Sequence, residues 1–306
     1  MDAVTPPSAC PPDQVTGRDS FLVEGAHANL WFEHHGPVLY VTFDNLATLD
    51  DPYPRLPWMH GRVTGLGYSI LGVQSFAKDW YRTPTAPALI RTLQAQGFFA
   101  RFETVIFTGA SMGGFAALHF ATLVPGARVL AFSPQSTMSR AITPFETRFG
   151  YAVRRSNWVD PPFLDAADAV PHLTNAVILY DPFVTEDRAH AARLAAPGVT
   201  FLKVGYFTHQ AIRFVIKCDA LPQMMAEYAT TGRIGADFWR RLRARKGLRV
   251  WRRAFVERLA ASRHPRLTLR VCDALLREGD YLFARRARAG VLARHPHLAP
   301  LERECS

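Results

Sequence analysis

The sequence has few cysteines, few lysines and no long apolar run. Its 306 residues include only four cysteines, at positions 10, 218, 272 and 305, and their spacing fits neither a zinc site nor a disulfide framework. No segment approaches the roughly 20 consecutive apolar residues that span a bilayer. The N-terminus lacks the basic and apolar regions of a secretory signal. We therefore expect a cytoplasmic protein with no membrane span.

Signatures of cofactor and metal sites are also missing. No glycine-rich pattern of the dinucleotide-binding or phosphate-loop type occurs, and no cluster of histidine, aspartate and glutamate suggests a metal. We therefore expect neither a cofactor nor a metal. The composition, 48% hydrophobic over 306 residues, is sufficient for one large domain with an appendage.

The most informative motif present is Gly-Ala-Ser-Met-Gly, residues 109–113. It follows the apolar, β-rich run 104–107 and precedes the apolar run 115–121. This G-x-S-x-G spacing is typical of a nucleophile elbow, in which a tight turn between strand and helix exposes the serine hydroxyl. The serine's strained backbone needs small residues two positions before and after it. Ser111 is the candidate nucleophile, although an ordinary glycine turn would give the same local pattern.

Two aspartates after this serine are candidates for the acid of a serine–acid–histidine triad. Asp181 directly follows the strand-like run 176–180, and the carboxyl ends of parallel strands form the edge where α/β sheets place ligands. We therefore predict Asp181 as the catalytic acid. Asp187 is the second choice, because it falls in the first turn of a predicted helix, where acids suit the helix dipole.

The candidate base is His209. It lies in a loop just after the strand-like run 199–204, so the chain order is serine, acid, histidine. The imidazole would take the Ser111 proton and return it to the leaving group, while the acid fixes its tautomer. His119, inside the helix behind the serine, is interpreted as a core histidine, and His60, in a loop, stays an alternative.

Residues from about 28 to 218 resemble an α/β-hydrolase. Eight strand-like runs match the family's eight strands, and the serine turn follows the fifth run, as it does in the family. The runs are 21–24, 29–33, 38–43, 68–73, 104–107, 128–132, 176–180 and 199–204. The resemblance implies a mostly parallel sheet with helices on both faces. The stretch 111–138 is also similar to poorly characterised bacterial hydrolase-like proteins, which favours an O-acyl group on a glycan or small metabolite as substrate.

The resemblance further implies two backbone amides that hold an oxyanion. Met112 would supply the first, because the helix starts directly behind Ser111. In the family the second donor follows the third strand, which here gives Asn45 or Leu46, and of these we choose Asn45. The following interval departs from the family, since three prolines between residues 52 and 57 predict an irregular loop in place of its first large helix.

A small cap insertion is expected at about residues 135–175, between the sixth and seventh strand-like runs. It mixes aromatic residues with arginines, a combination that suits a sugar, a nucleotide or an anionic acyl group. The candidates for lining the substrate pocket are Trp158 in this segment and the run Trp80, Tyr81 and Arg82 after the fourth strand. The alternative is that these aromatic residues only pack against the sheet.

The C-terminal region carries the excess positive charge. The whole chain is net +10, and residues 237–306 hold 18 basic against 7 acidic residues. Apolar residues at helical spacing predict four helices between residues 238 and 293, and residues 274–296 resemble a tetratricopeptide helical pair. We do not favour binding of nucleic acid or another polyanion, because arginine bias and a solvated face explain the charge. Nothing in the sequence indicates an oligomeric state.

The sequence thus predicts three regions: a disordered or extended N-terminus (1–20), an α/β-hydrolase domain (21–235) and a basic helical C-terminal region (236–306). We expect a serine hydrolase that cleaves a carboxylic ester or thioester through an acyl-enzyme intermediate. One alternative is an acyltransferase that uses the same triad. The other is a non-catalytic scaffold of hydrolase fold whose basic tail binds a partner.

Overall fold

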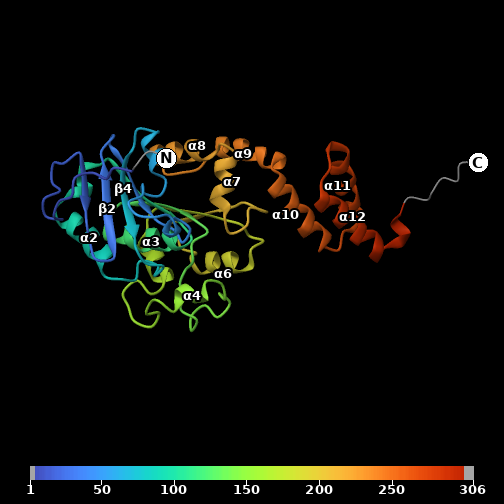
Figure 1. Ribbon diagram of the computed structural model, residues 1–306, viewed down its shortest axis with the longest axis horizontal. Helices are drawn as coiled ribbons and strands as arrows, with labels where there is room; N and C mark the ends of the chain where they lie inside the picture. The colour runs from blue at the N-terminus through green and yellow to red at the C-terminus, as the bar shows by residue number, and fades with distance from the viewer. Residues whose placement is uncertain (1–3, 300–306) are drawn as a thin grey trace, which may run out of the picture. The chain divides into compact units, whose positions relative to one another are not determined.

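A computed structural model describes residues 4–299 of the chain (Figure 1). They form two compact units, of which the first ends at Arg241 and the second begins at Leu242. The sequence places this boundary earlier, after residue 235. Helix α9 (Ala236–Leu242) spans the residues between the two boundaries, and its Phe238 side chain is fully buried. Residues 1–3 and 300–306, which belong to the predicted N-terminal and C-terminal regions, lie outside the described residues.

The first unit is built on one eight-stranded sheet with the strand order β1-β2-β4-β3-β5-β6-β7-β8. β2 pairs antiparallel with β1 and β4, and the other neighbours are parallel. The mostly parallel eight-stranded sheet expected from the sequence is thereby confirmed. The strands are β1 (Ser20–Val23), β2 (Ala28–Glu33), β3 (Val38–Phe43), β4 (Ser69–Ser75), β5 (Thr104–Ala110), β6 (Arg128–Phe132), β7 (Ala176–Tyr180) and β8 (Val199–Lys203).

Helices cover the sheet and explain the apolar sequences of its central strands. Helix α3 (Met112–Phe120) packs against β3, β5 and β6, and all nine of its residues are buried. A helix that is covered on all sides is expected to be apolar all round. Further helices of this unit are α1 (His60–Thr64), α2 (Thr85–Ala95), α6 (Thr185–Arg193), α7 (Ala211–Lys217) and α8 (Leu221–Thr231), with short 3-10 turns η2 (Phe98–Arg101) and η3 (Ala121–Leu123).

Two irregular segments follow the carboxyl ends of β3 and β6. The first, before β4, contains only the 3-10 turn η1 (Thr48–Asp50) and the five-residue helix α1, in keeping with its proline content. The second, residues 133–175, corresponds to the expected cap. It contains the short helices α4 (Gly150–Val153) and α5 (Ala166–Ala169) and the turn η4 (Val170–His172).

The N-terminal segment from residue 4 to residue 19 is ordered against the sheet without forming a regular element. Ala9 makes an isolated parallel bridge with Leu22, and the Cys10 amide donates a hydrogen bond of 2.9 Å to the Leu22 carbonyl. Val15 is fully buried. The amides of Gln14 and Arg18 close two turns by donating hydrogen bonds to the carbonyls of Pro11 and Val15.

The second unit is helical, as its periodicity predicts. After the 3-10 turn η5 (Arg243–Gly247) it contains α10 (Arg249–Ala260), α11 (Pro265–Glu278) and α12 (Leu282–Arg294), followed by η6 (Pro296–Leu298), in the orange-to-red part of Figure 1. Val256, Cys272, Leu275 and Ala284 form its small buried core. No helix in the described part of either unit is long and apolar enough to cross a bilayer.

Candidate active site

Ser111 occupies a strained turn between β5 and α3. Its φ of 55° and ψ of −116° are sparsely populated for a residue with a side chain. The glycines on either side are required by close packing. A Cβ on Gly109 would lie 2.2 Å from the Gly113 carbonyl carbon, and a Cβ on Gly113 would lie 2.7 Å from the Phe43 carbonyl oxygen. The G-x-S-x-G spacing therefore has a steric cause in this chain.

The Ser111 hydroxyl contacts His209, and His209 contacts Asp187. The Nε2 atom of His209 lies 2.9 Å from Ser111 Oγ, and its Nδ1 lies 2.8 and 2.9 Å from the two oxygens of Asp187. A carboxylate at Nδ1 fixes the tautomer in which Nδ1 carries the proton and Nε2 accepts one. The arrangement has the geometry of a nucleophile, a general base and an orienting acid.

The structure corrects the prediction of Asp181 as the catalytic acid, because the Asp181 carboxylate accepts hydrogen bonds from backbone amides and does not contact His209. Its Oδ1 accepts the amide of Phe183 at 2.9 Å, and its Oδ2 accepts the amide of Thr208 at 2.8 Å. These two bonds tie the loop after β7 to the loop that carries His209, and they occupy both carboxylate oxygens. Asp187, the second choice, contacts the imidazole instead, because the first turn of α6 directs its buried carboxylate toward His209.

Asp187 belongs to a buried network of charged groups. Arg148, from the segment between β6 and β7, lies 3.0 Å from Asp187 Oδ1 and 2.6 Å from Glu146 Oε2. Glu146 also accepts a hydrogen bond from His190 Nε2 at 3.1 Å. Burial alone would raise the pKa of Glu146, but hydrogen bonds from His190 and Arg148 outweigh it and lower the pKa to about 2. Glu146 is therefore a carboxylate at neutral pH.

A third side chain touches the serine hydroxyl. Gln135 Nε2 donates a hydrogen bond of 2.9 Å to Ser111 Oγ, and Gln135 Oε1 accepts one of 3.1 Å from Trp80 Nε1. Gln135 belongs to no catalytic motif, so the sequence alone does not predict this contact. Its position three residues beyond the end of β6, at the same sheet edge as Ser111, is the available signal.

The two predicted oxyanion donors lie beside the serine. Met112 is the first residue of α3, where backbone N–H groups have no partner within the helix. Asn45 and Leu46 both line the cavity that contains Ser111. The Asn45 amide lies 3.4 Å from Thr48 Oγ1, whereas the Leu46 amide has no hydrogen-bond acceptor within residues 4–299. Leu46 therefore offers the freer N–H of the two.

Ser111 and His209 open into a cavity of about 520 Å³. Its apolar lining comes mainly from the loop after β3 and from helix α7. These side chains are Leu46, Trp58, Met59, Phe149, Ile212 and Ile216. Two exposed charged residues, Asp51 and Arg213, also line the cavity. The cavity is of a size that holds a small organic ligand.

None of the four predicted pocket residues lines this cavity. Trp80 is fully buried and binds Gln135, and the buried Tyr81 hydroxyl donates to the carbonyls of Asp44 and Val73. A positive φ at both residues turns the run inward. The packing alternative is thus the correct one for this pair.

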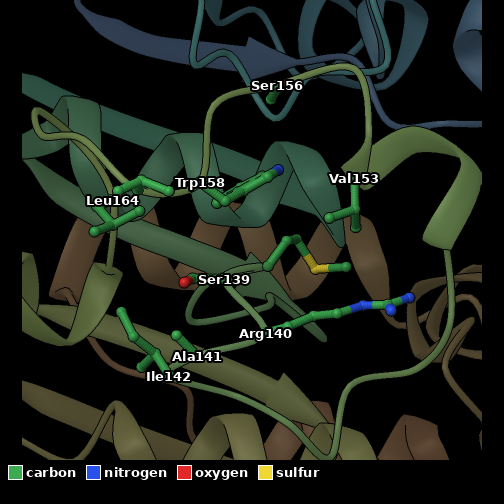
Figure 2. Close-up of a pocket in the computed structure, with 10 residues that line it drawn as sticks. Ser139, Arg140, Ala141, Ile142, Val153, Ser156, Trp158 and Leu164 are labelled. Carbon is green, nitrogen blue, oxygen red and sulfur yellow. The ribbon is translucent and has the colours of Figure 1, made fainter.

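Arg82 and Trp158 also lie away from the serine. Arg82 donates to backbone carbonyls of the segment between β6 and β7, including that of Asn157 at 2.7 Å, and so holds this segment in place. Trp158 lines a different cavity, of about 490 Å³, together with Arg140, Ile142 and Leu164 (Figure 2). His60, the alternative base, pairs with Glu33 at 3.1 Å and does not contact Ser111.

The strand order, the strained serine turn after β5 and the histidine after β8 identify the architecture. The chain has an α/β-hydrolase fold. No protein-family model matches the sequence, and no curated protein matches it. Within residues 4–299, no group of three or more histidine, cysteine, aspartate or glutamate side chains is placed to hold a metal ion.

Several solved structures are similar to it at low identity. The capsule O-acetyltransferase of Neisseria meningitidis serogroup A is 10% identical, with a TM-score of 0.46 over 66% of this chain and 93% of that chain. MPT51 of Mycobacterium tuberculosis is 15% identical, with a TM-score of 0.48 over 69% and 97%. Est1E of Butyrivibrio proteoclasticus is 11% identical, with a TM-score of 0.44 over 70% and 100%.

Proposed function

We propose that the protein is a serine hydrolase or acyl transferase that acts on a carboxylic ester or thioester through an acyl-enzyme. The observation that carries this proposal is the contact of 2.9 Å between Ser111 Oγ and His209 Nε2, with Asp187 on the other ring nitrogen. A serine hydroxyl is a weak nucleophile until a base accepts its proton, and this geometry supplies the base. The adjoining cavity offers room for the acyl group.

The chemistry follows from these contacts. The Ser111 proton passes to His209 Nε2 as Oγ bonds to the substrate carbonyl carbon, and the carbonyl electron pair moves to its oxygen. The amides of Met112 and Leu46 would hold this oxyanion. When the carbonyl re-forms, the alcohol or thiol leaves with the proton from His209, and Ser111 remains acylated. Asp187 stabilises the imidazolium during the transfer.

The acceptor in the second half-reaction decides between the two activities. Water activated by His209 gives a hydrolase, whereas an alcohol bound in the same place gives an acyl transferase. Both use the same three side chains. Partitioning of a preformed acyl-enzyme between water and added glycerol, followed by the ratio of free acid to glyceryl ester, measures this preference.

A fluorophosphonate probe tests the proposal directly, because it phosphonylates only an activated serine. We expect one adduct on the full-length protein, and we expect Ser111→Ala and His209→Ala to abolish it. The matched control is Ser133→Ala, which removes a buried serine hydroxyl that has no hydrogen-bond partner among residues 4–299 and should label normally. An adduct that persists in Ser111→Ala would refute the proposed nucleophile. Absence of labelling in the wild type would favour the non-catalytic scaffold.

A further inference from the structure

Gln135 is a fully buried amide that connects Ser111 to Trp80. It follows Ser133 and Pro134 in the turn that leaves β6. Its Nε2 lies 2.9 Å from Ser111 Oγ, and its Oε1 lies 3.1 Å from Trp80 Nε1. Both ends of the amide are therefore engaged, one of them by the atom that would attack the substrate.

The indole of Trp80 fixes the direction of this amide. Indole N–H is a donor only, so the group that faces it must be the carbonyl oxygen of Gln135. The NH₂ group is then directed at Ser111. In the reversed orientation, two donors would meet at Trp80, and buried polar groups rarely remain unpaired. Ser111 Oγ thus accepts a hydrogen bond from Gln135, and its single proton is left to bond His209 Nε2.

Trp80 is itself held in an unusual conformation. Its backbone φ is +55°, in the left-handed region that side-chain-bearing residues seldom adopt. The carboxylate of Asp79 stabilises this turn by accepting the amides of Tyr81 and Thr83 at 3.0 and 3.1 Å. The indole also packs edge-on against the Trp158 ring, with ring centroids 6.0 Å apart. A strained backbone that is over-determined by its surroundings is often found where a side chain must be aimed.

We propose that Gln135 is a further catalytic residue of the reaction proposed above, and that Trp80 is its positioning residue. The inference rests on Ser111 being the nucleophile. As the Ser111 Oγ–H bond breaks and the proton moves to His209 Nε2, negative charge grows on Oγ until the bond to the carbonyl carbon forms. The Gln135 N–H stabilises that charge and holds Oγ in line with the imidazole. Gln135 neither gains nor loses a proton in this step.

Kinetics of Gln135→Met test the role of the amide. Methionine keeps the length and volume of the side chain and removes the donor. We expect kcat for p-nitrophenyl acetate and the rate of fluorophosphonate labelling to fall about 10- to 100-fold, since hydrogen bonds to charged groups are the stronger ones. KM should change less than threefold, because the Gln135 amide bonds to Ser111 Oγ and does not contact the bound ester before Oγ attacks it.

Trp80→Phe tests the positioning role and has a matched control. It removes the N–H and keeps an aromatic ring, and we expect kcat to fall about 3- to 10-fold as the amide loses its fixed direction. Trp158→Phe makes the same change in the neighbouring ring, whose Nε1 has no hydrogen-bond partner among residues 4–299. It should leave kcat unchanged. In the Gln135→Met background, Trp80→Phe should cause no further loss, because the two residues act as a unit.

The double variant also keeps the test valid if Gln135→Met alone does not fold. It replaces both hydrogen-bonding partners by apolar groups, which costs less than leaving the indole N–H unpaired. Equal kcat and equal labelling rates for wild type, the double variant and Trp80→Phe would overturn this inference alone. A wild type that does not label at Ser111 would overturn the proposed function and this inference with it. Loss of kcat in the double variant, with normal kcat in Trp158→Phe, supports it.

Discussion

Arg148 Nη2 lies 3.0 Å from the Asp187 carboxylate that contacts His209. The side chains of Asp187 and Glu146 are both almost fully buried, and Arg148 lies between them. Two carboxylates can remain ionised together in a buried place only when a cation offsets their repulsion. The segment between β6 and β7 therefore contributes to the electrostatic environment of the candidate active site.

Replacing Arg148 should destabilise the protein. Arg148→Met leaves two buried carboxylates without their shared cation, and we expect the free energy of unfolding to fall by about 2–3 kcal/mol, less than for a fully buried pair because the arginine is 23% exposed. Arg240→Met is the matched control. It breaks an exposed pair with Asp237 and should cost under about 0.5 kcal/mol. Urea unfolding measures both, and equal losses would contradict the role of Arg148.

Asp187→Asn should impair catalysis far more than Asp181→Asn. An amide at position 187 can no longer accept the Nδ1 proton at both oxygens and favours the wrong tautomer, so we expect kcat to fall about 10³- to 10⁴-fold. Asp181 only accepts backbone amides, and its asparagine variant should stay within about tenfold of the wild type. Initial rates with p-nitrophenyl acetate give both values. A larger loss in Asp181→Asn would restore it as the acid.

The sequence predicts the framework of the site better than its contacts. Ser111 and His209 are predictable because each follows a strand, and parallel strands bring their carboxyl ends to one edge of the sheet. Asp181 also follows a strand, yet its carboxylate oxygens accept hydrogen bonds from backbone amides of the neighbouring loops and do not contact His209. The orientation of α6, which directs Asp187 toward the imidazole, depends on tertiary packing and leaves no local signal.

The pocket residues illustrate a second limit. Trp80 and Tyr81 follow a strand and carry aromatic rings, a pattern that predicts side chains lining the substrate pocket. Their left-handed backbone instead turns both rings into the core. Single-residue backbone conformations of this kind are set by neighbouring contacts, here the Asp79 carboxylate, and not by residue type. The proposed role of Gln135 cannot be predicted from the sequence for the same reason, since it depends on the direction of the Trp80 side chain.

Gly109→Ala should prevent stable folding of the first unit. The added Cβ would lie 2.2 Å from the backbone of Gly113, which cannot move without displacing the serine turn. We expect a loss of stability of several kcal/mol and no probe labelling. Gly290→Ala, in helix α12, meets only the flexible end of Arg294 at 3.9 Å and should stabilise the second unit by about 0.5–1 kcal/mol. Thermal unfolding distinguishes the two, and a normally folded, active Gly109→Ala would contradict the steric argument.

His119 should make the fold sensitive to acid. Burial, assisted by the nearby Arg82 charge, lowers its pKa to about 3, whereas an unfolded chain titrates near 6.5. Between these values the unfolded state binds a proton that the folded state excludes, so stability falls as the pH falls, by about 1.4 kcal/mol per unit.

His119→Phe removes this penalty. Its free energy of unfolding relative to the wild type should therefore rise by about 2 kcal/mol between pH 7.5 and pH 5.0 in urea titrations. Leu118→Ala, a non-titrating change on the same buried helix, should cost the same at both pH values. A pH-independent difference for His119→Phe would show that the folded protein accommodates the protonated imidazole.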